Sequence, residues 1–193
     1  MAILLPGGAG YIGSHTAVEL LNAGKEIVII DNFSNSKPEV LDKIKQITGK
    51  DFKFYEMDYS NKEELNKVFT ENKIDAVLNF AGYKAVGESV KKPIEYYMNN
   101  ISGALVLLDV MRAHNCKKFI FSSSATVYGD PATVPITEDF PTGGTTNPYG
   151  TTKLFIEQIL KDIYNSDNSW DICILRYFNP VGAHESGLIG EEP

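Results

Sequence analysis

A phenol and an ammonium lie four residues apart in the segment Tyr149-Gly150-Thr151-Thr152-Lys153, within a helical pattern. Side chains at this spacing share one face of a helix. A free tyrosine has a pKa of about 10 and is a poor base at neutral pH. We expect Lys153, together with a positively charged ring beside the phenol, to stabilise the phenolate and lower the pKa of Tyr149, which predicts proton transfer with a hydroxyl. The spacing alone is also typical of a helix surface pair without chemistry.

A run of three serines, Ser122-Ser123-Ser124, follows the apolar residues of a predicted strand. Open α/β sheets bind ligands at the carboxyl ends of their strands. We therefore predict that the Ser124 hydroxyl bonds the same substrate oxygen as Tyr149. For Ser122 and Ser123, an ordinary polar strand end is the alternative.

Three glycines, Gly7, Gly10 and Gly13, separate the first predicted strand from a helix. Glycine allows a tight turn, close approach of a pyrophosphate to the backbone, and close packing of helix on strand. The amides of Tyr11 and Ile12 open the helix, where the helix dipole favours phosphate. The pattern predicts a dinucleotide-binding turn, although spaced glycines alone also occur in structural turns.

The second predicted strand ends at Asp31, which Asn32 follows. A carboxylate at this position accepts hydrogen bonds from the adenosine ribose hydroxyls and repels a 2′-phosphate. We therefore predict NAD rather than NADP as the cofactor. Asp58, after the third predicted strand, is either a contact to the adenine amino group or a solvated loop aspartate.

These residues need a framework, and the alternation of short apolar runs with helical patterns predicts βαβ units around a parallel sheet. The expected strands span residues 2–5, 26–31, 52–55, 76–80, 119–122 and 172–177. The expected helices span residues 11–22, 38–48, a segment opened by a capping box at residues 60–63 and ending near 71, 93–114 and 149–165. Residues 129–146 are expected to form a loop. The predicted fold class is a doubly wound parallel α/β sheet.

Composition excludes several function classes. With 193 residues the chain suits one sizeable domain, and a net charge of −7 argues against nucleic-acid binding. No apolar run reaches the length of a membrane span, and the start lacks the basic region of a signal peptide, so we expect a cytoplasmic protein. Cys116 and Cys173 show no metal or redox spacing, which predicts two buried reduced thiols and no metal site.

Six segments together resemble the extended short-chain dehydrogenase/reductase family, and within it the UDP-galactose (UDP-glucose) 4-epimerases. They are GGAGYIGSH at 7–15, DN at 31–32, FAGYKAVGES at 80–89, SSSATVYG at 122–129, NPYGTTK at 147–153 and RYFNPVGAH at 176–184. The segments span almost the whole chain in the family's order. The resemblance implies a Rossmann domain over residues 1–180, with residues 181–193 beginning a smaller C-terminal substrate domain that we expect to be largely absent.

The resemblance implies interconversion of UDP-galactose and UDP-glucose by transient oxidation at C4 with bound NAD, a reaction of galactose metabolism. Ser124, Tyr149 and Lys153 would be catalytic, and Lys84, Ser124, Tyr149 and Asn179 would contact the UDP-sugar. Cofactor contacts are implied for Gly7, Gly10, Tyr11, Ile12, Gly13, Asp31, Asn32, Phe33, Ser34, Asn35, Ser36, Asp58, Tyr59, Phe80, Ala81, Gly82, Tyr83, Lys84, Asn99, Ser124, Tyr149, Lys153 and Phe178. Lys84 is equally typical of a solvated loop charge.

The chain departs from the family at Pro6, where threonine is usual, and at Asn79, where histidine is common. Proline is tolerated only at a strand end and would loosen the turn, whereas we expect little effect from Asn79. Other members of the family, such as 4,6-dehydratases or decarboxylases, remain alternatives, although dehydratases show Asp-Glu where this chain has Ala125-Thr126. A chain that binds NAD without chemistry is a further alternative. For the full-length protein we expect a homodimer formed through the helices at 93–114 and 149–165.

Overall fold

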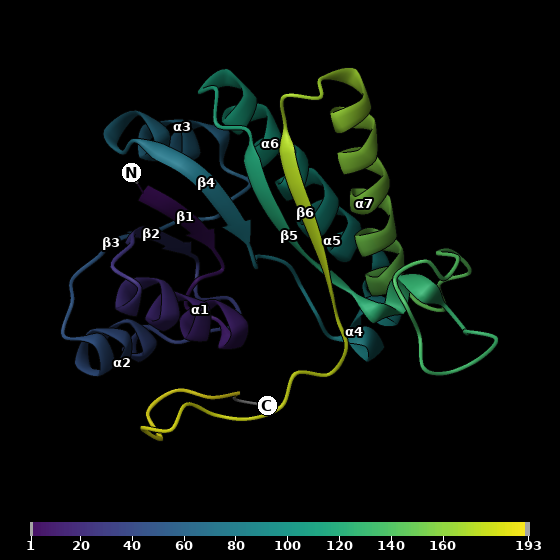
Figure 1. Ribbon diagram of the computed structural model, residues 1–193, viewed down its shortest axis with the longest axis horizontal. Coiled ribbons are helices and arrows are strands. Elements are labelled where there is room, and N and C mark those ends of the chain that lie inside the picture. Colours follow the sequence, from purple (N-terminus) through teal and green to yellow (C-terminus); the bar gives the residue numbers. More distant parts are fainter. Residues whose placement is uncertain (1, 192–193) are drawn as a thin grey trace.

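The computed structural model describes residues 2–191, which form a parallel β-sheet with helices on both faces (Figure 1). The strands are β1 (Ala2–Pro6), β2 (Glu26–Asp31), β3 (Lys53–Glu56), β4 (Ile74–Asn79), β5 (Lys118–Ser124) and β6 (Asp171–Tyr177). Their order is β3-β2-β1-β4-β5-β6, and every adjacent pair is parallel. This is the doubly wound order of a Rossmann sheet, so the predicted fold class is confirmed.

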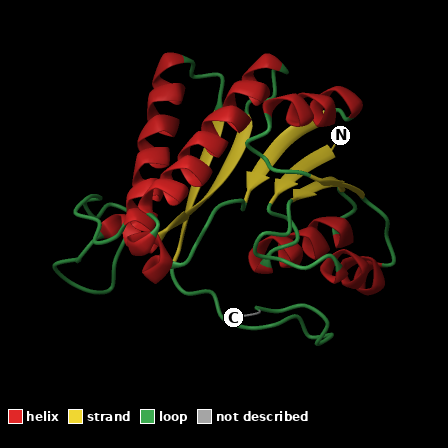
Figure 2. Cartoon of the chain, turned by 180° about the vertical axis from the view of Figure 1, so that it is seen from behind, coloured by secondary structure: helices red, strands yellow, loops and turns green. Residues whose placement is uncertain are grey.

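The helices divide between the two faces of the sheet (Figures 1 and 2). One face carries α1 (Tyr11–Asn22) and α2 (Glu39–Thr48), and the other carries α3 (Lys62–Glu71), α6 (Gly103–Ala113) and α7 (Pro148–Ser166). Shorter elements are α4 (Val86–Lys91), α5 (Pro93–Tyr97), the π-helical turn η1 (Met98–Ser102) and the 3-10 turn η2 (Ala125–Tyr128). No helix within residues 2–191 is long and apolar enough to cross a bilayer.

Strand β2 shows why the central strands are almost continuously apolar. Ile27 and Ile29 pack under α1 and α2, whereas Val28 and Ile30 point to the opposite face and pack in the cluster under α3 and α6. All four are at most 3% exposed. Because successive side chains of a strand alternate between faces, a strand covered on both sides needs apolar residues at every position.

Strand β6 lies at the edge of the sheet, and its two faces differ. Ile172 and Ile174 pack against the core cluster that contains α7 residues. Cys173 and Leu175 point the other way and are exposed, because no helix of the described residues covers this face. The prediction of two buried thiols is therefore confirmed for Cys116 and wrong for Cys173.

The segment predicted as one helix over residues 93–114 is interrupted, so that prediction is wrong in its middle. The π-helical turn η1 separates α5 from α6. The Tyr59 hydroxyl donates to the carbonyl of Asn99 at 2.6 Å, and a Cβ on Gly103 would lie 2.3 Å from the Tyr59 ring. A side chain that bonds into the helical ladder in this way is a recognised cause of a local change in helix geometry.

Smaller differences concern the ends of elements. The predicted helix after β3 exists as α3, but its N-cap is Asn61 rather than Ser60, since the Asn61 side chain accepts from the amide of Glu64. The Ser60 hydroxyl instead donates to Asp58 at 2.6 Å. The helix α4 lies between β4 and α5, where no element was predicted.

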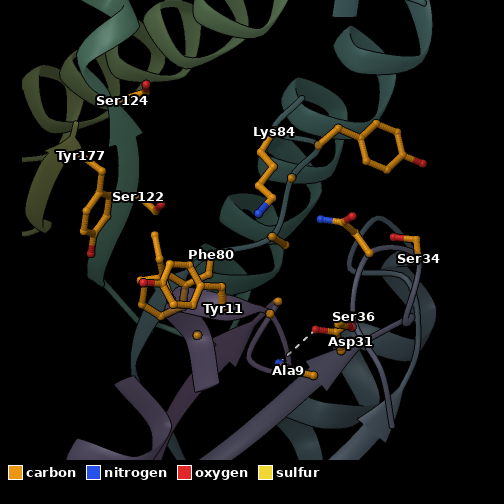
Figure 3. Close-up of a pocket in the computed structure, with 18 of the residues that line it drawn as sticks. Ala9, Tyr11, Asp31, Ser34, Ser36, Phe80, Lys84, Ser122, Ser124 and Tyr177 are labelled. Atoms are coloured by element: carbon orange, nitrogen blue, oxygen red, sulfur yellow. Dashed lines mark hydrogen bonds between the residues drawn. The ribbon is translucent and has the colours of Figure 1, made fainter. Parts of the chain in front are cut away.

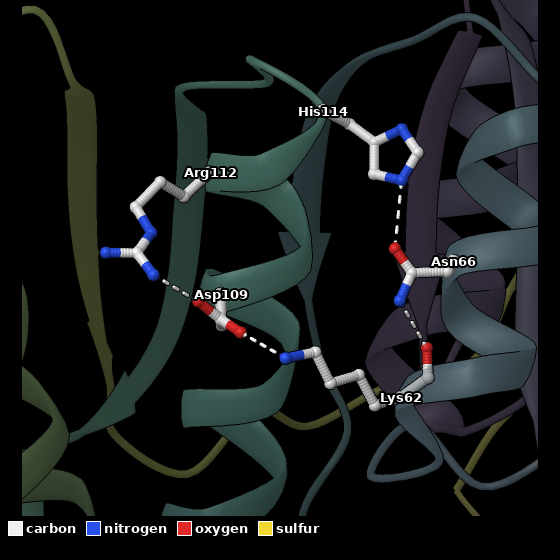
Figure 4. A network of polar contacts seen from close by, with 5 residues as sticks. All are labelled: Lys62, Asn66, Asp109, Arg112 and His114. Atoms are coloured by element: carbon white, nitrogen blue, oxygen red, sulfur yellow. Dashed lines mark hydrogen bonds and ion pairs between the residues drawn. The ribbon is translucent and has the colours of Figure 1, made fainter.

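A polar network joins α3 and α6 on the surface (Figure 4). Asp109 accepts from Lys62 at 2.6 Å and from Arg112 at 2.5 Å. Close by, the His114 ring pairs with the side chain of Asn66 at 3.0 Å. These bonds fix two neighbouring helices at a distance from the strand ends where ligands bind in such sheets.

Candidate active site

The turn between β1 and α1 occupies space in which side chains do not fit. Gly7 has a φ of +72°, and a Cβ there would lie 2.7 Å from the amide nitrogen of Ala81. A Cβ on Gly13 would lie 2.4 Å from the carbonyl oxygen of Gly7. Pro6 is the last residue of β1, and its carbonyl still accepts from the Phe80 amide at 2.9 Å. The backbone itself thus forms the wall of the site, as predicted for a phosphate-binding turn.

The N-terminus of α1 is open to an anion. Gly10 is the N-cap residue, and among the described residues no side chain caps the helix and no acidic residue occupies its first turn. Helix N-termini present unpaired amides and a positive dipole end. The amides of Tyr11 and Ile12 therefore suit a phosphate group, and both residues line the adjoining cleft.

Asp31 ends β2 and connects the turn to the following loop. One carboxylate oxygen accepts from the Ala9 amide at 3.1 Å, a bond drawn in Figure 3. The other accepts from the Phe33 amide at 3.0 Å and from the Ser36 hydroxyl at 2.8 Å. A carboxylate offers about four acceptor positions, so capacity remains for a ligand hydroxyl.

At the opposite end of the cleft, α7 positions the phenol and the ammonium. The Asn147 side chain caps this helix by accepting from the Gly150 amide at 2.8 Å. The Lys153 ammonium lies 5.7 Å from the centre of the Tyr149 ring and donates to the carbonyl of Ser122 at 2.8 Å. Lys153 is only 6% exposed, so it is held in place rather than solvated.

Ser124 is the last residue of β5 and is almost completely buried. Its hydroxyl oxygen accepts from the Thr126 amide at 3.2 Å and from the Thr126 hydroxyl at 3.0 Å. With both acceptor positions used, its own proton is free to be donated, and the hydroxyl bonds the Tyr149 phenol. A proton path from a substrate oxygen to Tyr149 thus has a second hydroxyl beside it.

The glycine turn with Asp31 and the group of Ser124, Tyr149 and Lys153 line opposite ends of one continuous cleft. Its volume is about 390 Å³, a size typical of ligand sites. Figure 3 shows Asp31, Ser34 and Ser36 at one end, Ser122, Ser124 and Tyr177 at the other, and Lys84 between them in this view. The residues singled out from the sequence that line this cleft are Gly7, Gly10, Tyr11, Ile12, Gly13, Asp31, Asn32, Ser34, Asn35, Ser36, Tyr59, Phe80, Ala81, Gly82, Tyr83, Lys84, Asn99, Ser124, Tyr149, Lys153, Phe178 and Asn179.

Two of the residues predicted to contact the cofactor lie outside the wall of the cleft. Phe33 packs on Phe54 with ring centres 5.3 Å apart. Asp58 accepts from the side chain of Asn32 at 3.2 Å and from Ser60, and Met57 lines the cleft at this point instead. Their side chains therefore support the loops that form the wall.

Residues 3–190 match the family described as NAD dependent epimerase/dehydratase. The chain belongs to this family. It is similar to a UDP-glucose 4-epimerase of Haemophilus influenzae, with 63% identity over 193 residues, and to one of Bacillus subtilis, with 61% identity. Each comparison covers 100% of this chain and 57% of the relative, so the chain spans little more than half the length of these relatives.

Solved structures of the family show the same fold. A UDP-glucose 4-epimerase from Bifidobacterium longum, in complex with NAD+ and UDP, superimposes with a TM-score of 0.98 at 61% identity and covers 100% of this chain and 58% of its own. A UDP-Glc/GlcNAc 4-epimerase from Campylobacter jejuni superimposes with a TM-score of 0.87 at 39% identity, covering 92% of this chain and 53% of its own. The agreement extends over both ends of the cleft.

The cleft fits the dinucleotide that the family's description names. The glycine turn leaves no room for a Cβ where a pyrophosphate approaches, and the uncapped N-terminus of α1 offers amides to its charge. The Asp31 carboxylate at the end of β2 suits a ribose diol and disfavours a phosphate on it.

Burial dominates the ionisation of the phenol and the ammonium. Burial raises the pKa of Tyr149, an effect opposed by the hydrogen bond from Ser124, and burial lowers the pKa of Lys153 to about 8. In the protein alone the net shift is upward, because removing the phenolate from water has the larger effect. That Lys153 and a positively charged ring together lower the Tyr149 pKa stays a prediction for the protein with its cofactor bound. A cationic ring beside Tyr149, such as oxidised nicotinamide, would lower the Tyr149 pKa.

Sequence reasoning missed several residues of this family site. Thr126, which bonds Ser124, and Tyr177, at the end of β6, both line the cleft. Glu191 pairs with Lys84 at 3.2 Å, so Lys84 has a charged partner although about half of its side chain is exposed. A hydroxyl two residues after Ser124 is a detectable local signal, whereas the 107 positions between Lys84 and Glu191 leave none.

Proposed function

We propose that this chain carries the NAD-binding and catalytic part of a UDP-glucose 4-epimerase, which interconverts UDP-galactose and UDP-glucose. Relatives of that name are 61–63% identical over the whole chain, and one similar structure holds NAD+ and UDP. Because the chain spans 57% of the relatives' length, the proposal concerns the activity of the whole protein.

One observation carries the proposal: a dinucleotide cradle and a buried Ser-Tyr-Lys set line the same cleft. Gly7, Gly13 and Asp31 form the cradle at one end. Ser124 and Tyr149, with Lys153 behind them, form the other. A site of this kind can hold a redox cofactor and move a proton at a sugar hydroxyl beside it.

The cofactor that we propose is NAD, held by the residues of the cradle, the loop at 80–84 and Asn99. When bound, NAD supplies a hydride acceptor and donor for C4 of the sugar. The Asp31 carboxylate binds the adenosine ribose, and the amides of Tyr11 and Ile12 bind the pyrophosphate. Phe178, exposed in part at the cleft, contributes an apolar wall beside the reacting ring.

Tyr149 is the proposed acid and base. Its phenolate takes the proton from the sugar 4-hydroxyl as that carbon is oxidised to a ketone, and the phenol returns the proton when the ketone is reduced on its other face. Ser124 donates to the same oxygens and keeps them in line. Lys153 stabilises the phenolate through its ammonium, which remains charged at pH 7 because its pKa is about 8.

The substrate is proposed to lie between Lys84 and Tyr149. Lys84 carries a cation to the middle of the cleft, where the diphosphate of a UDP-sugar needs one, and its contact with Glu191 is exposed and exchangeable. Asn179, in the wall after β6, offers an amide to the sugar nucleotide. The position of the cation therefore favours a sugar nucleotide over a neutral sugar.

A 4,6-dehydratase needs an additional acid and base beside the sugar. At the corresponding position this chain has Ala125 and Thr126, which form the 3-10 turn η2. The Thr126 hydroxyl is bonded to Ser124 and is no carboxylate. This chemistry favours epimerisation over elimination of water.

The proposal is tested by incubating the purified full-length protein that carries this chain with UDP-galactose without added NAD and measuring UDP-glucose. The Haemophilus relative serves as the positive control. We expect UDP-glucose to form, whereas a 4-keto-6-deoxy product would assign dehydration instead. Absence of any product from the full-length protein, with the control active, would contradict the proposal.

The Tyr149→Phe variant tests the role of the phenol. Removal of the hydroxyl should lower kcat by about 1,000-fold, since general acid–base groups contribute about 100- to 10,000-fold, while NAD remains bound. Turnover is followed by the coupled UDP-glucose assay and NAD by its absorbance after denaturation. Retained activity would remove Tyr149 from the mechanism.

We further propose that residues 1–180 form the cofactor domain, that residues 181–193 begin the substrate-binding part, and that the protein is cytoplasmic. The segment 182–191 already contributes to the cleft, because the Tyr11 hydroxyl donates to the Gly182 carbonyl at 2.7 Å and Glu191 lines the wall. Two unpaired cysteines suit a reducing compartment. Fractionation of cells that express the tagged chain tests the location.

The full-length protein is proposed to be a homodimer that pairs through α5, α6 and α7. Apolar side chains on these elements and η1 are exposed, among them Ile94 at 73%, Met98 at 62% and Phe155 at 49%. Apolar residues gathered on one side in this way mark association sites. Ile94→Glu with Met98→Glu should convert the dimer to a monomer in analytical ultracentrifugation, and an unchanged mass would place the interface elsewhere.

A further inference from the structure

We propose that the buried ion pair between Glu157 and Arg176 is a positioning device that holds the end of β5 against α7, and thereby sets the geometry of Ser124 and Tyr149. The inference rests on the proposed function, because it concerns how that catalytic set is held. Neither Glu157 nor Arg176 lines the cleft, so both act through other residues.

Glu157 is placed to act on the catalytic helix. It lies on α7 one turn after Lys153 and two turns after Tyr149, on the same face. Its exposure is 0%, and both carboxylate oxygens are bonded. One oxygen accepts from the Ser123 hydroxyl at 2.6 Å and from Arg176 Nε at 3.0 Å, and the other accepts from Arg176 Nη2 at 2.8 Å.

Arg176 joins three further parts of the chain to this carboxylate. It belongs to β6, and its fork binds Glu157 through two parallel bonds, the most directional form of ion pair. Its remaining nitrogen donates to the Tyr128 hydroxyl at 2.8 Å and to the Glu138 carbonyl at 3.3 Å. The guanidinium also lies 4.8 Å from the centre of the Tyr128 ring. One side chain therefore ties together β6, α7, η2 and the loop after η2.

The consequence for catalysis follows from the position of Ser123, directly before Ser124. The end of β5 is bonded to α7 twice, through the Ser122 carbonyl and Lys153, and through the Ser123 hydroxyl and Glu157. Ser124 and Tyr149 lie on these same two elements. Because catalytic groups misplaced by about 1 Å can lose about 100-fold in rate, this double connection has a direct effect on chemistry.

Stability alone does not explain an ion pair whose carboxylate is fully buried and whose guanidinium is only 17% exposed. Replacing such a pair by apolar residues of similar volume is often neutral or stabilising, because two charges no longer have to leave water. The hydrogen bonds of the ion pair require a particular orientation of both side chains, whereas contacts between apolar side chains do not. The arrangement is therefore suited to fixing an orientation rather than to increasing the free energy of unfolding.

Three changes test the inference in the full-length protein with NAD bound. Ser123→Ala removes only the hydroxyl between the two elements, and Glu157→Gln removes the charge. We expect kcat to fall about tenfold and about 100-fold respectively, with the KM for UDP-galactose changed less than about twofold. The matched control is Asp167→Asn, which breaks the 2.8 Å pair with Lys117 at the other end of α7 and should leave kcat unchanged.

A stability-matched variant separates positioning from folding. Glu157→Leu combined with Arg176→Met keeps the volume and removes both charges. If positioning is the role, this variant regains the wild-type Tm while kcat stays low. Recovery of kcat together with Tm, or wild-type kcat in Ser123→Ala, would overturn the inference.

An NMR titration, which needs no turnover, tests the inference independently of the proposed function. Tyrosine labelled with 13C at Cζ reports the ionisation of Tyr149, whose signal is assigned with Tyr149→Phe. The hydrogen bond from Ser124 lowers the Tyr149 pKa, and loss of the connection between β5 and α7 should weaken this bond. The Tyr149 pKa should therefore rise by about 0.5 in Ser123→Ala and stay unchanged in Asp167→Asn. An unchanged titration would reject the positioning role even if the chain does not epimerise UDP-galactose.

Discussion

The two ends of the cleft are built by different means. At the dinucleotide end, Gly7, Gly13 and Asp31 lie within 25 positions of one another, and the backbone forms most of the surface. At the other end, which we propose to be catalytic, the side chains of Ser124, Tyr149 and Lys153 form the surface, and separate elements bring them together. The first end thus depends on empty space, whereas the second depends on the exact placement of buried polar groups.

This difference predicts different kinds of fragility. At the dinucleotide end, adding a single methyl group should weaken NAD binding, although no functional side chain is removed. At the end that we propose to be catalytic, removing a buried charge should lower activity and raise the free energy of unfolding, because the charge no longer has to leave water. Such a trade between activity and stability is known from many enzymes.

The largest expected effect tests the space beside Gly7. Gly7→Ala and Gly24→Ala impose the same strain of about 1–2 kcal/mol, because both glycines have a φ near +72°. Only at Gly7 does the new Cβ meet backbone, 2.7 Å from Ala81 N, whereas nothing lies within 4 Å at Gly24. We expect Gly7→Ala to lower NAD affinity by about 100-fold and Gly24→Ala to leave it unchanged in calorimetric titration. Equal affinities would show that the turn has room to move.

A smaller effect is expected from Lys153→Met, in the direction of greater stability. Burial lowers the Lys153 pKa to about 8 from 10.5, so the folded protein binds fewer protons than the unfolded chain between these values. The free energy of unfolding of the wild type therefore rises with pH through this window, and below it the charge costs up to about 3 kcal/mol.

Urea unfolding at about pH 7 and about pH 9.5 measures this cost. Lys153→Met should be more stable than the wild type at the lower pH, with the difference shrinking at the higher pH, and it should not epimerise UDP-galactose. A variant that is less stable at both values would mean that the Lys153 bond to Ser122 outweighs the burial of its charge.

The smallest effect is expected far from both ends, in the network of Figure 4. Hydrogen bonds from Lys62 and Arg112 lower the pKa of Asp109, so its contribution to stability is present above the unfolded carboxyl pKa and is lost as the pH falls. The side chains are exposed, and Asp109→Asn should lower the free energy of unfolding by at most about 1 kcal/mol, less in high salt. A loss that salt does not reduce would argue against an electrostatic origin.

Much of the fold could be predicted because its determinants are local. The limits of α1 and β2 are those expected from the sequence, since a glycine turn, a glycine stop and an apolar run mark them. The break at η1 was not predicted, because it depends on the Tyr59 hydroxyl from 40 positions away. The exposure of Cys173 was not predicted either, since an apolar strand pattern does not reveal which strand lies at an edge.

The sequence by itself determined the parallel α/β framework, the dinucleotide turn with its acidic strand end, and the spacing that puts Tyr149 and Lys153 on one helix face. Only the tertiary structure decided that burial raises the Tyr149 pKa, that Phe33 and Asp58 do not line the cleft, and that Glu157 and Arg176 connect β5, α7 and β6. The reason is physical. Local patterns fix backbone geometry through short-range sterics, whereas burial, ionisation and the partners of a charge depend on every element packed around it.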